Sequence, residues 1–158
     1  HIPIRIGNEK PMTGYRIMQA VHPELSTNNR SLVVEVSYGK KRLLLTGDIE
    51  EEAETLLSNE LRDVDWLKAP HHGSKNASSN ALLQATQPKF VVVSCGKLNR
   101  FGHPHPQTIQ RLSKHSDILR TDIHGSIRVY AKADKLWAET TSPLRPKRLW
   151  TSDPHSTK

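Results

Sequence analysis

Short apolar runs of strand length alternate along the chain with polar runs rich in helix-forming residues. The runs at 32–38 and 42–46 flank a Gly-containing turn, which predicts a hairpin whose second strand is buried on both faces. Further strands are predicted at the apolar runs 64–69, 89–94, 118–121 and 126–131. Helix formers predict helices at 49–57, 80–85 and 108–112. This alternation predicts an α/β (α+β) fold.

The two ends of the chain are patterned less regularly. The alternating residues at 2–6 and the run at 15–21 predict two short strands before the hairpin. From about Ala133 the pattern fails, because the prolines further on cannot continue a helix or a central strand. We therefore expect one domain at residues 1–132 and a basic, mobile tail at residues 133–158, with Trp137 and Trp150 pinning parts of that tail to the domain.

Composition and charge narrow the class of protein. The 158 residues suffice for one domain with a real core, and no apolar run approaches the roughly 18 residues that a membrane span requires. The formal net charge of +7 suits a polyanionic partner such as nucleic acid, although a basic solvated surface explains it equally well. Cys95 is the only cysteine, which excludes an intramolecular disulfide and a Cys-based zinc site.

Two polar turns, each at the end of a predicted strand, form the candidate site. Asp48 follows the run at 42–46, and the His71-His72-Gly73-Ser74 turn follows the run at 64–69. Ligands of α/β proteins gather at the carboxyl ends of strands, and a carboxylate with an imidazole suits a divalent metal. Adjacent histidines point differently, so one binds the metal while the other faces the substrate. Taken alone, the spacing of Asp48 favours a plain helix N-cap.

The loop at 95–106 adds a second group of polar side chains. It carries two imidazoles, His103 and His105, together with the basic residues Lys97 and Arg100. The flanking prolines stiffen the loop by fixing their own φ angles. A Pro-rich surface loop with solvated histidines is the alternative, and His103 is favoured over His105 as a functional residue.

Several stretches together resemble the metallo-β-lactamase superfamily. They are most similar to the metallo-β-lactamase-like domain of DNA-internalisation competence proteins of the ComEC family. The resemblance covers roughly residues 20 to 131, and its motifs occur in the same order as in that family. The matching stretches are 28–33, 44–50, 64–74, 99–106 and 120–127.

The resemblance implies an αββα sandwich with two divalent ions, zinc or manganese, along one edge. Asp48 falls on the bridging aspartate, which also takes part in catalysis. His72 would be a metal ligand, His71 a phosphate-facing catalytic group, and His103 a further ligand or substrate contact. The implied reaction is hydrolysis of a phosphodiester of DNA, single-stranded in the competence system, by a metal-activated water. The expected substrate-binding residues are Ser74, Lys97, Asn99, Arg100 and His105.

One departure from the superfamily pattern affects these expectations. The main metal motif, a His-x-His-x-Asp-His-like run, belongs upstream, and no such run occurs in the sequence. We therefore expect the carboxyl-terminal half of the sandwich, with weak metal affinity and no activity without the amino-terminal half. That missing half is an expected partner besides DNA. A further expected partner is a membrane channel in the same full-length protein of the bacterial inner membrane.

Two other functions stay open. The first is a hydrolase of the same fold that acts on a small phosphodiester or on RNA. The second is a non-catalytic nucleic-acid-binding module that lacks the main metal motif. Positive charge fits both a nuclease and a binding module, whereas the combination of Asp48, His71 and His72 favours an enzyme.

Overall fold

The strands of the main sheet lie side by side in the order in which they occur along the chain. The computed structural model describes residues 13–132, 135–142 and 148–150. The sheet is antiparallel from β1 to β3 and parallel from β3 to β6. Its strands are β1 (Thr13–Met18), β2 (Val33–Tyr38), β3 (Lys41–Leu45), β4 (Trp66–Lys68), β5 (Phe90–Val93) and β6 (Asp117–Arg120).

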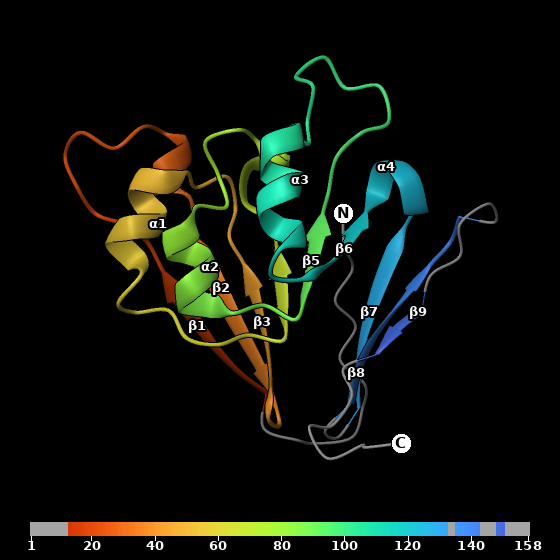
Figure 1. Ribbon diagram of the computed structural model, residues 1–158. Coiled ribbons are helices and arrows are strands. Elements are labelled where there is room, and N and C mark those ends of the chain that lie inside the picture. Colours follow the sequence, from red (N-terminus) through yellow and green to blue (C-terminus); the bar gives the residue numbers. More distant parts are fainter. Residues whose placement is uncertain (1–12, 133–134, 143–147, 151–158) are drawn as a thin grey trace.

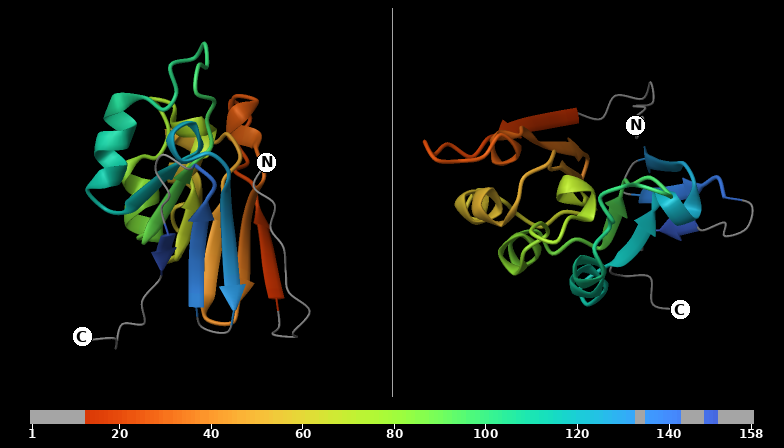
Figure 2. Two further views of the ribbon diagram at one scale, coloured as in Figure 1. Left: turned by 90° about the vertical axis from the view of Figure 1, so that its right-hand side faces the viewer. Right: turned by 90° about the horizontal axis from the view of Figure 1, so that it is seen from above.

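Helices cover one face of this sheet, and a second sheet lies over the part of the other face that β4, β5 and β6 form (Figures 1 and 2). The second sheet is antiparallel, with the order β7-β8-β9. Its strands are β7 (Ile127–Lys132), β8 (Lys135–Thr140) and β9 (Arg148–Trp150). The helices are α1 (Glu51–Leu57), α2 (Asn80–Thr86), α3 (Pro106–Ser113) and the single turn α4 (Thr121–His124), with 3-10 turns at Asn28–Arg30 and Pro70–Gly73.

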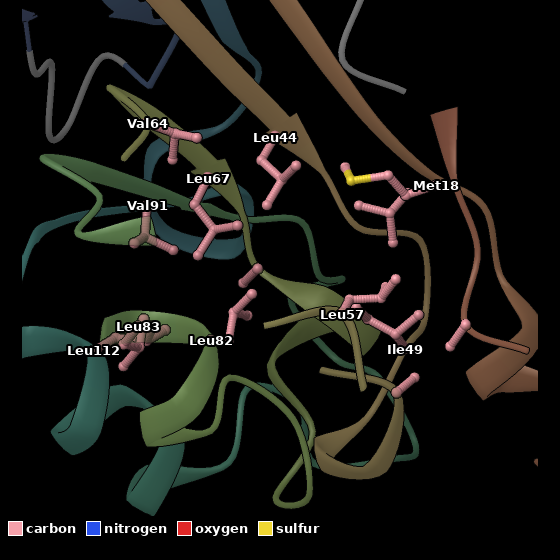
Figure 3. Close-up of a cluster of buried hydrophobic side chains, with 14 of the residues drawn as sticks. Met18, Leu44, Ile49, Leu57, Val64, Leu67, Leu82, Leu83, Val91 and Leu112 are labelled. Atoms are coloured by element: carbon pink, nitrogen blue, oxygen red, sulfur yellow. The ribbon is translucent and has the colours of Figure 1, made fainter. Parts of the chain in front are cut away.

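Two apolar clusters lie on opposite faces of the six-stranded sheet. Because side chains alternate along a strand, Leu67 belongs to the helix-side cluster while its neighbour Trp66 belongs to the cluster beneath the second sheet. Val91 and Val92 divide in the same way, so β4 and β5 read as continuous apolar runs. The helix-side cluster, drawn in Figure 3, includes Met18, Leu44, Ile49, Leu57, Leu82, Leu83 and Leu112.

These layers confirm the predicted mixed α/β class. The described residues form three of the four layers of an αββα sandwich: helices, a mixed sheet and a small antiparallel sheet (Figure 2). The hairpin, the later strands and the helices lie close to their predicted ranges. Among residues 13–132, 135–142 and 148–150, none of the helices has the length and apolar character of a membrane span. The strand predicted at 2–6 lies outside the described residues.

The expectation that regular structure ends near residue 132 is wrong for the described residues beyond it. β8 pairs with β7 along its whole length, and Leu136 and Ala138 are fully buried against the main sheet. Trp137, which alternates with them, stacks on Tyr130 at 5.3 Å between ring centroids. This period of two went unrecognised because charged residues interrupt the apolar pattern on either side. Residues 133–134, 143–147 and 151–158, the rest of the predicted tail, lie outside the described part.

Candidate metal and substrate site

The two predicted turns meet at one edge of the main sheet. β3 and β4 are parallel neighbours, so the residues that follow them emerge at the same edge. The Nε2 atom of His72 lies 3.7 Å from Oδ1 of Asp48, and both side chains are partly exposed. The backbone N–H of His71 donates to the carbonyl of Gly47, which joins the two turns directly.

Left-handed backbone conformations shape both turns. Gly47 has a φ of +57°, and a Cβ atom there would lie 2.7 Å from Cβ of Ser31. His71 and His72 also have positive φ angles, of 43° and 53°. Such conformations are costly for non-glycine residues and concentrate at functional sites. The rings of His71 and His72 are 6.4 Å apart at 64° between planes, and their Nδ1 atoms contact different partners, Glu50 and Ser94.

His72 has the hydrogen bonding of a metal-ligating histidine. Its Nδ1 lies 2.7 Å from the carbonyl oxygen of Ser94. A carbonyl only accepts, so Nδ1 carries a proton, and in the neutral imidazole the lone pair is then on Nε2, on the side of Asp48. The donor pair Asp48 Oδ1 and His72 Nε2 thus fits a divalent cation in atom type and protonation state.

The capping interpretation of Asp48 is wrong. The N-cap of α1 is Glu50, two residues later, and Ile49 is fully buried before the helix begins. Asn29 accepts a hydrogen bond from the backbone N–H of Glu50 with its side-chain oxygen, at 2.7 Å. The side chain of Asn29, from the preceding 3-10 turn, thus contacts the start of α1. The Asp48 carboxylate does not cap the helix and lies near His72 at the end of the strands.

His103 lies in the same neighbourhood but beside His71 rather than Asp48. The ring centroids of His71 and His103 are 5.6 Å apart. Burial lowers the pKa of His103, and the neighbouring His71, His72 and His105 lower it further, which favours the neutral imidazole. Among the described residues, no three His, Cys, Asp or Glu side chains come together as a metal site. The structure brings together two of the three predicted ligands.

Two further residues at this edge were missed by the sequence analysis. Glu50 Oε1 lies 3.0 Å from Nδ1 of His71, so this carboxylate orients the imidazole. The ammonium of Lys68, largely buried, donates to the carbonyl of Gly47 at 2.9 Å and lies 3.9 Å from Oδ1 of Asp48. Burial lowers the pKa of Lys68, while the charge of Asp48 opposes that shift. A lysine within an apolar strand that leads into the histidine turn was the available signal for Lys68.

The predicted substrate-binding residues divide into two groups. Lys97 and Arg100 are exposed on the loop between β5 and α3. The side chain of Asn99 is engaged within the loop, where it donates to the carbonyls of Gly96 and His103. His105 is the N-cap of α3 and accepts from the N–H of Gln107.

Ser74 lies beneath the turn rather than at its surface. It is 5% exposed, and its buried hydroxyl has no hydrogen-bond partner among the described residues. Its carbonyl accepts a hydrogen bond from the Thr108 hydroxyl at 2.7 Å, which ties the turn to α3. Ser74 therefore stabilises the turn through its backbone. Its side chain is buried and not exposed to a substrate.

The thiol of Cys95 is in an environment that makes it a poor nucleophile. Burial and the neighbouring carboxyl group of Asp122 raise the pKa of its thiol to about 11, so the thiolate is scarce at neutral pH. Asp122 accepts from Cys95 and from the Arg120 guanidinium, and these contacts join the ends of β5 and β6. This cluster supports the sheet edge and supplies no nucleophile.

Comparison with known proteins identifies the class to which this arrangement belongs. Residues 13–97, just over half of the chain, match the Metallo-beta-lactamase superfamily. The chain therefore belongs to this superfamily, as its motifs indicate.

Individual relatives narrow the comparison. ComE operon protein 3 of Bacillus subtilis (strain 168) is 43% identical over 105 residues, which is 65% of this chain and 14% of that protein. Recombination protein 2 of Haemophilus influenzae is 36% identical over 110 residues, 69% of this chain and 14% of that protein. Competence protein ComA of Neisseria gonorrhoeae is 34% identical over 107 residues, 65% and 16% respectively. The chain thus spans 14 to 16% of the length of these relatives.

Proposed function

We propose that this chain is part of a metal-dependent phosphodiester hydrolase domain of a DNA-uptake protein, and that its substrate is DNA. The observation that carries the proposal is the pairing of the Asp48 carboxylate with the lone-pair nitrogen of His72 at the sheet edge. His71 and the basic loop at 95–106 lie beside that pair. Carboxylate, imidazole and cationic side chains together suit a metal and a phosphate group.

The comparisons support the biological setting of the proposal. Superfamily membership supports a hydrolase that uses divalent metal ions. A relative named for competence supports a role in DNA uptake. Because the chain matches a small fraction of each relative, location in the bacterial inner membrane and a channel within the same full-length protein are part of the proposal.

Each side chain has a separate task in the proposed reaction. Asp48 and His72 would hold a zinc or manganese ion, and the amino-terminal half of the domain would supply the further ligands for two ions. When bound, the metal lowers the pKa of a water and supplies the nucleophile. As an imidazolium, His71 would donate through Nε2–H to a phosphate oxygen or to the leaving oxygen, while its Nδ1–H donates to the Glu50 carboxylate. Lys97 and Arg100 attract the phosphate backbone.

Metal binding by the full chain tests the ligand assignment. Asp48→Ala and His72→Ala should each lower the affinity for manganese or zinc by at least about tenfold in isothermal titration, because each removes one donor of the pair. Asp63→Ala and His115→Ala, at exposed positions away from the site, should leave the affinity unchanged. Unchanged affinity in both site variants would contradict the assignment.

Cleavage assays separate the enzyme from a binding module. A longer protein that includes the amino-terminal half should cut fluorescent single-stranded DNA only with metal, and a chelator or Asp48→Ala should abolish the cutting. A non-catalytic nucleic-acid-binding module is the second candidate, supported by the exposed Lys97 and Arg100, which bind phosphates with or without a metal. DNA binding that persists without any cleavage would favour this second candidate, and cleavage of RNA alone would change the substrate.

A further inference from the structure

The loop between β5 and α3 exposes two large apolar side chains next to the candidate site. In Figure 1 and the left panel of Figure 2 this loop projects at the top, beyond the helices and the sheet edge. Leu98 is 97% exposed and Phe101 is 66% exposed. Apolar groups gathered on a projecting loop are typical of a contact surface, because solvent alone does not favour them there.

The same loop is positively charged. Residues 95–106 contain Lys97, Arg100 and two histidines but no acidic residue. The guanidinium carbon of Arg100 lies 4.8 Å from the centre of the Phe101 ring, a cation–π contact that joins the charge to the aromatic surface. A partner that complements this loop would therefore carry a flat or apolar group together with negative charge.

Internal hydrogen bonds hold the loop in shape and against the histidine turn. Asn99 donates to Gly96 and His103 and accepts from the His103 N–H at 2.9 Å. The N–H of His105 donates to the carbonyl of Gly73 at 2.8 Å, which anchors the loop on the turn. A surface prepared in this way loses little conformational entropy on binding.

A chain of rings leads from the loop into the site. The Phe101 ring stacks on His103 at 5.8 Å and 18° between planes, and His103 in turn lies 5.6 Å from His71. A group bound on Phe101 is therefore one imidazole away from His71. One extended ligand can therefore contact both Phe101 and the candidate site.

We propose that Phe101, with Leu98 and Arg100, is a stacking platform for an unpaired base, so that the site selects single strands and frayed ends over duplex. The proposal rests on the proposed function in taking nucleic acid as the ligand of this site, and it adds the loop residues that would select the single-stranded form. An unpaired base offers its face to an aromatic ring, whereas a base inside a duplex is already stacked on both sides. Lys97 and Arg100 supply the contact with phosphate.

An anionic lipid surface is the other chemistry that an apolar, basic loop could meet. Nucleic acid is favoured because the ring contacts from Phe101 through His103 to His71 connect the loop to the candidate site. Binding to a bilayer surface would not require that connection. In addition, Arg100 packs on the aromatic ring rather than apart from it. Binding to anionic vesicles, measured beside the nucleic acids, distinguishes the two ligands.

The test measures binding of the full chain, without metal, to a fluorescent oligothymidylate and to a duplex of the same length by fluorescence anisotropy. Phe101→Ala should weaken single-strand binding about tenfold and leave duplex binding nearly unchanged, because only unpaired bases stack. Phe101→Trp should restore the single-strand affinity. Tyr15→Ala, which removes a 75% exposed aromatic ring from the edge strand β1, should change neither affinity. Melting temperatures equal to that of the parent chain verify that the exposed substitutions leave the fold intact.

The proposal is overturned if Phe101→Ala leaves single-strand affinity unchanged, or weakens single-strand and duplex binding equally. It is also overturned if the variant loses binding to phosphatidylglycerol vesicles while its single-strand affinity stays the same. Its failure is separable from that of the proposed function. Phe101-dependent single-strand binding without metal-dependent cleavage keeps the platform and rejects the hydrolase. Asp48-dependent cleavage with unchanged affinity in Phe101→Ala keeps the hydrolase and rejects the platform.

Discussion

The ionic contacts of single residues hold β4, the strand that leads into the histidine turn, at both of its ends. At the carboxyl end, the Lys68 ammonium contacts the Gly47 carbonyl beside Asp48. At the amino end, the buried Asp65 carboxylate accepts from the ammonium groups of Lys41 and Lys89, at 3.3 and 3.0 Å. The position of the histidine turn therefore depends on charged groups within an otherwise apolar sheet.

Asp65 makes the stability of the domain sensitive to acid. Burial by itself raises the pKa of this carboxyl group, but the Lys89 hydrogen bond, the Arg42 N–H and the two ammonium charges outweigh it and lower the pKa below its ordinary 3.8. A lowered folded-state pKa stabilises the fold above the unfolded value, and that stabilisation is lost as the pH falls through the folded value. Asp65→Asn should therefore reduce the free energy of unfolding at neutral pH by about 2 kcal/mol and flatten its decline in acid.

Urea unfolding followed by circular dichroism over a series of pH values measures this effect. Asp63→Asn, an exposed carboxylate two residues away, is the matched control and should change little. Equal acid dependence in Asp65→Asn and the parent chain would contradict the argument.

Close packing between the histidine turn and the loop at 95–106 assembles the site. Gly73 has a φ of +80°, and a Cβ atom there would lie 2.8 Å from Cβ of Pro104 and 3.2 Å from the Val93 side chain. The loop at 95–106 can thus approach the histidine turn only because residue 73 has no side chain. This contact places His103 beside His71 and Phe101 beyond it.

Gly73→Ala should separate the loop from the turn. The substitution combines backbone strain with a steric clash, so we expect a loss of at least about 2 kcal/mol in the free energy of unfolding, together with weaker single-strand binding. Gly102→Ala is an informative control, because Gly102 also has a positive φ, of +67°, but a Cβ atom there meets nothing within 4 Å. The difference between the two variants in urea unfolding measures the close approach, and equal losses would show that strain alone matters.

At the scale of the whole molecule, the second sheet completes the core on the face opposite the helices (Figure 2). Trp66 and Phe90 of the main sheet, stacked at 5.1 Å between ring centroids, lie beneath it. Without β7 and β8, these side chains would face water. The residues after 132 therefore contribute to the stability of the sheet that carries the site.

Leu136→Ala tests that contribution. Leu136 is fully buried, so truncation should cost about 2–5 kcal/mol of unfolding free energy through lost burial and the cavity left behind. Leu98→Ala, the same change at a 97% exposed position, should cost almost nothing. Chemical denaturation compares the two, and a negligible effect of Leu136→Ala would mean that β8 does not belong to the folded core.

Local signals in the sequence are sufficient to predict the order of most strands and helices, because apolar runs and helix formers are recognisable without tertiary contacts. The sequence also places Asp48 and His72 together, because the residues that follow two neighbouring parallel strands emerge at the same edge of the sheet. Which donor atoms remain available there depends on how separate segments fold together. Glu50 orients His71, Lys68 lies beside Asp48, and Asn99 and His105 are used within their own loop and helix.

These side-chain contacts could not be predicted from the sequence, because each joins residues from separate segments. Local hydrophobic and polar patterns contain no information about such contacts. The same reason explains β8, whose alternating residues are recognisable as a strand only once β7 and the main sheet lie beside them.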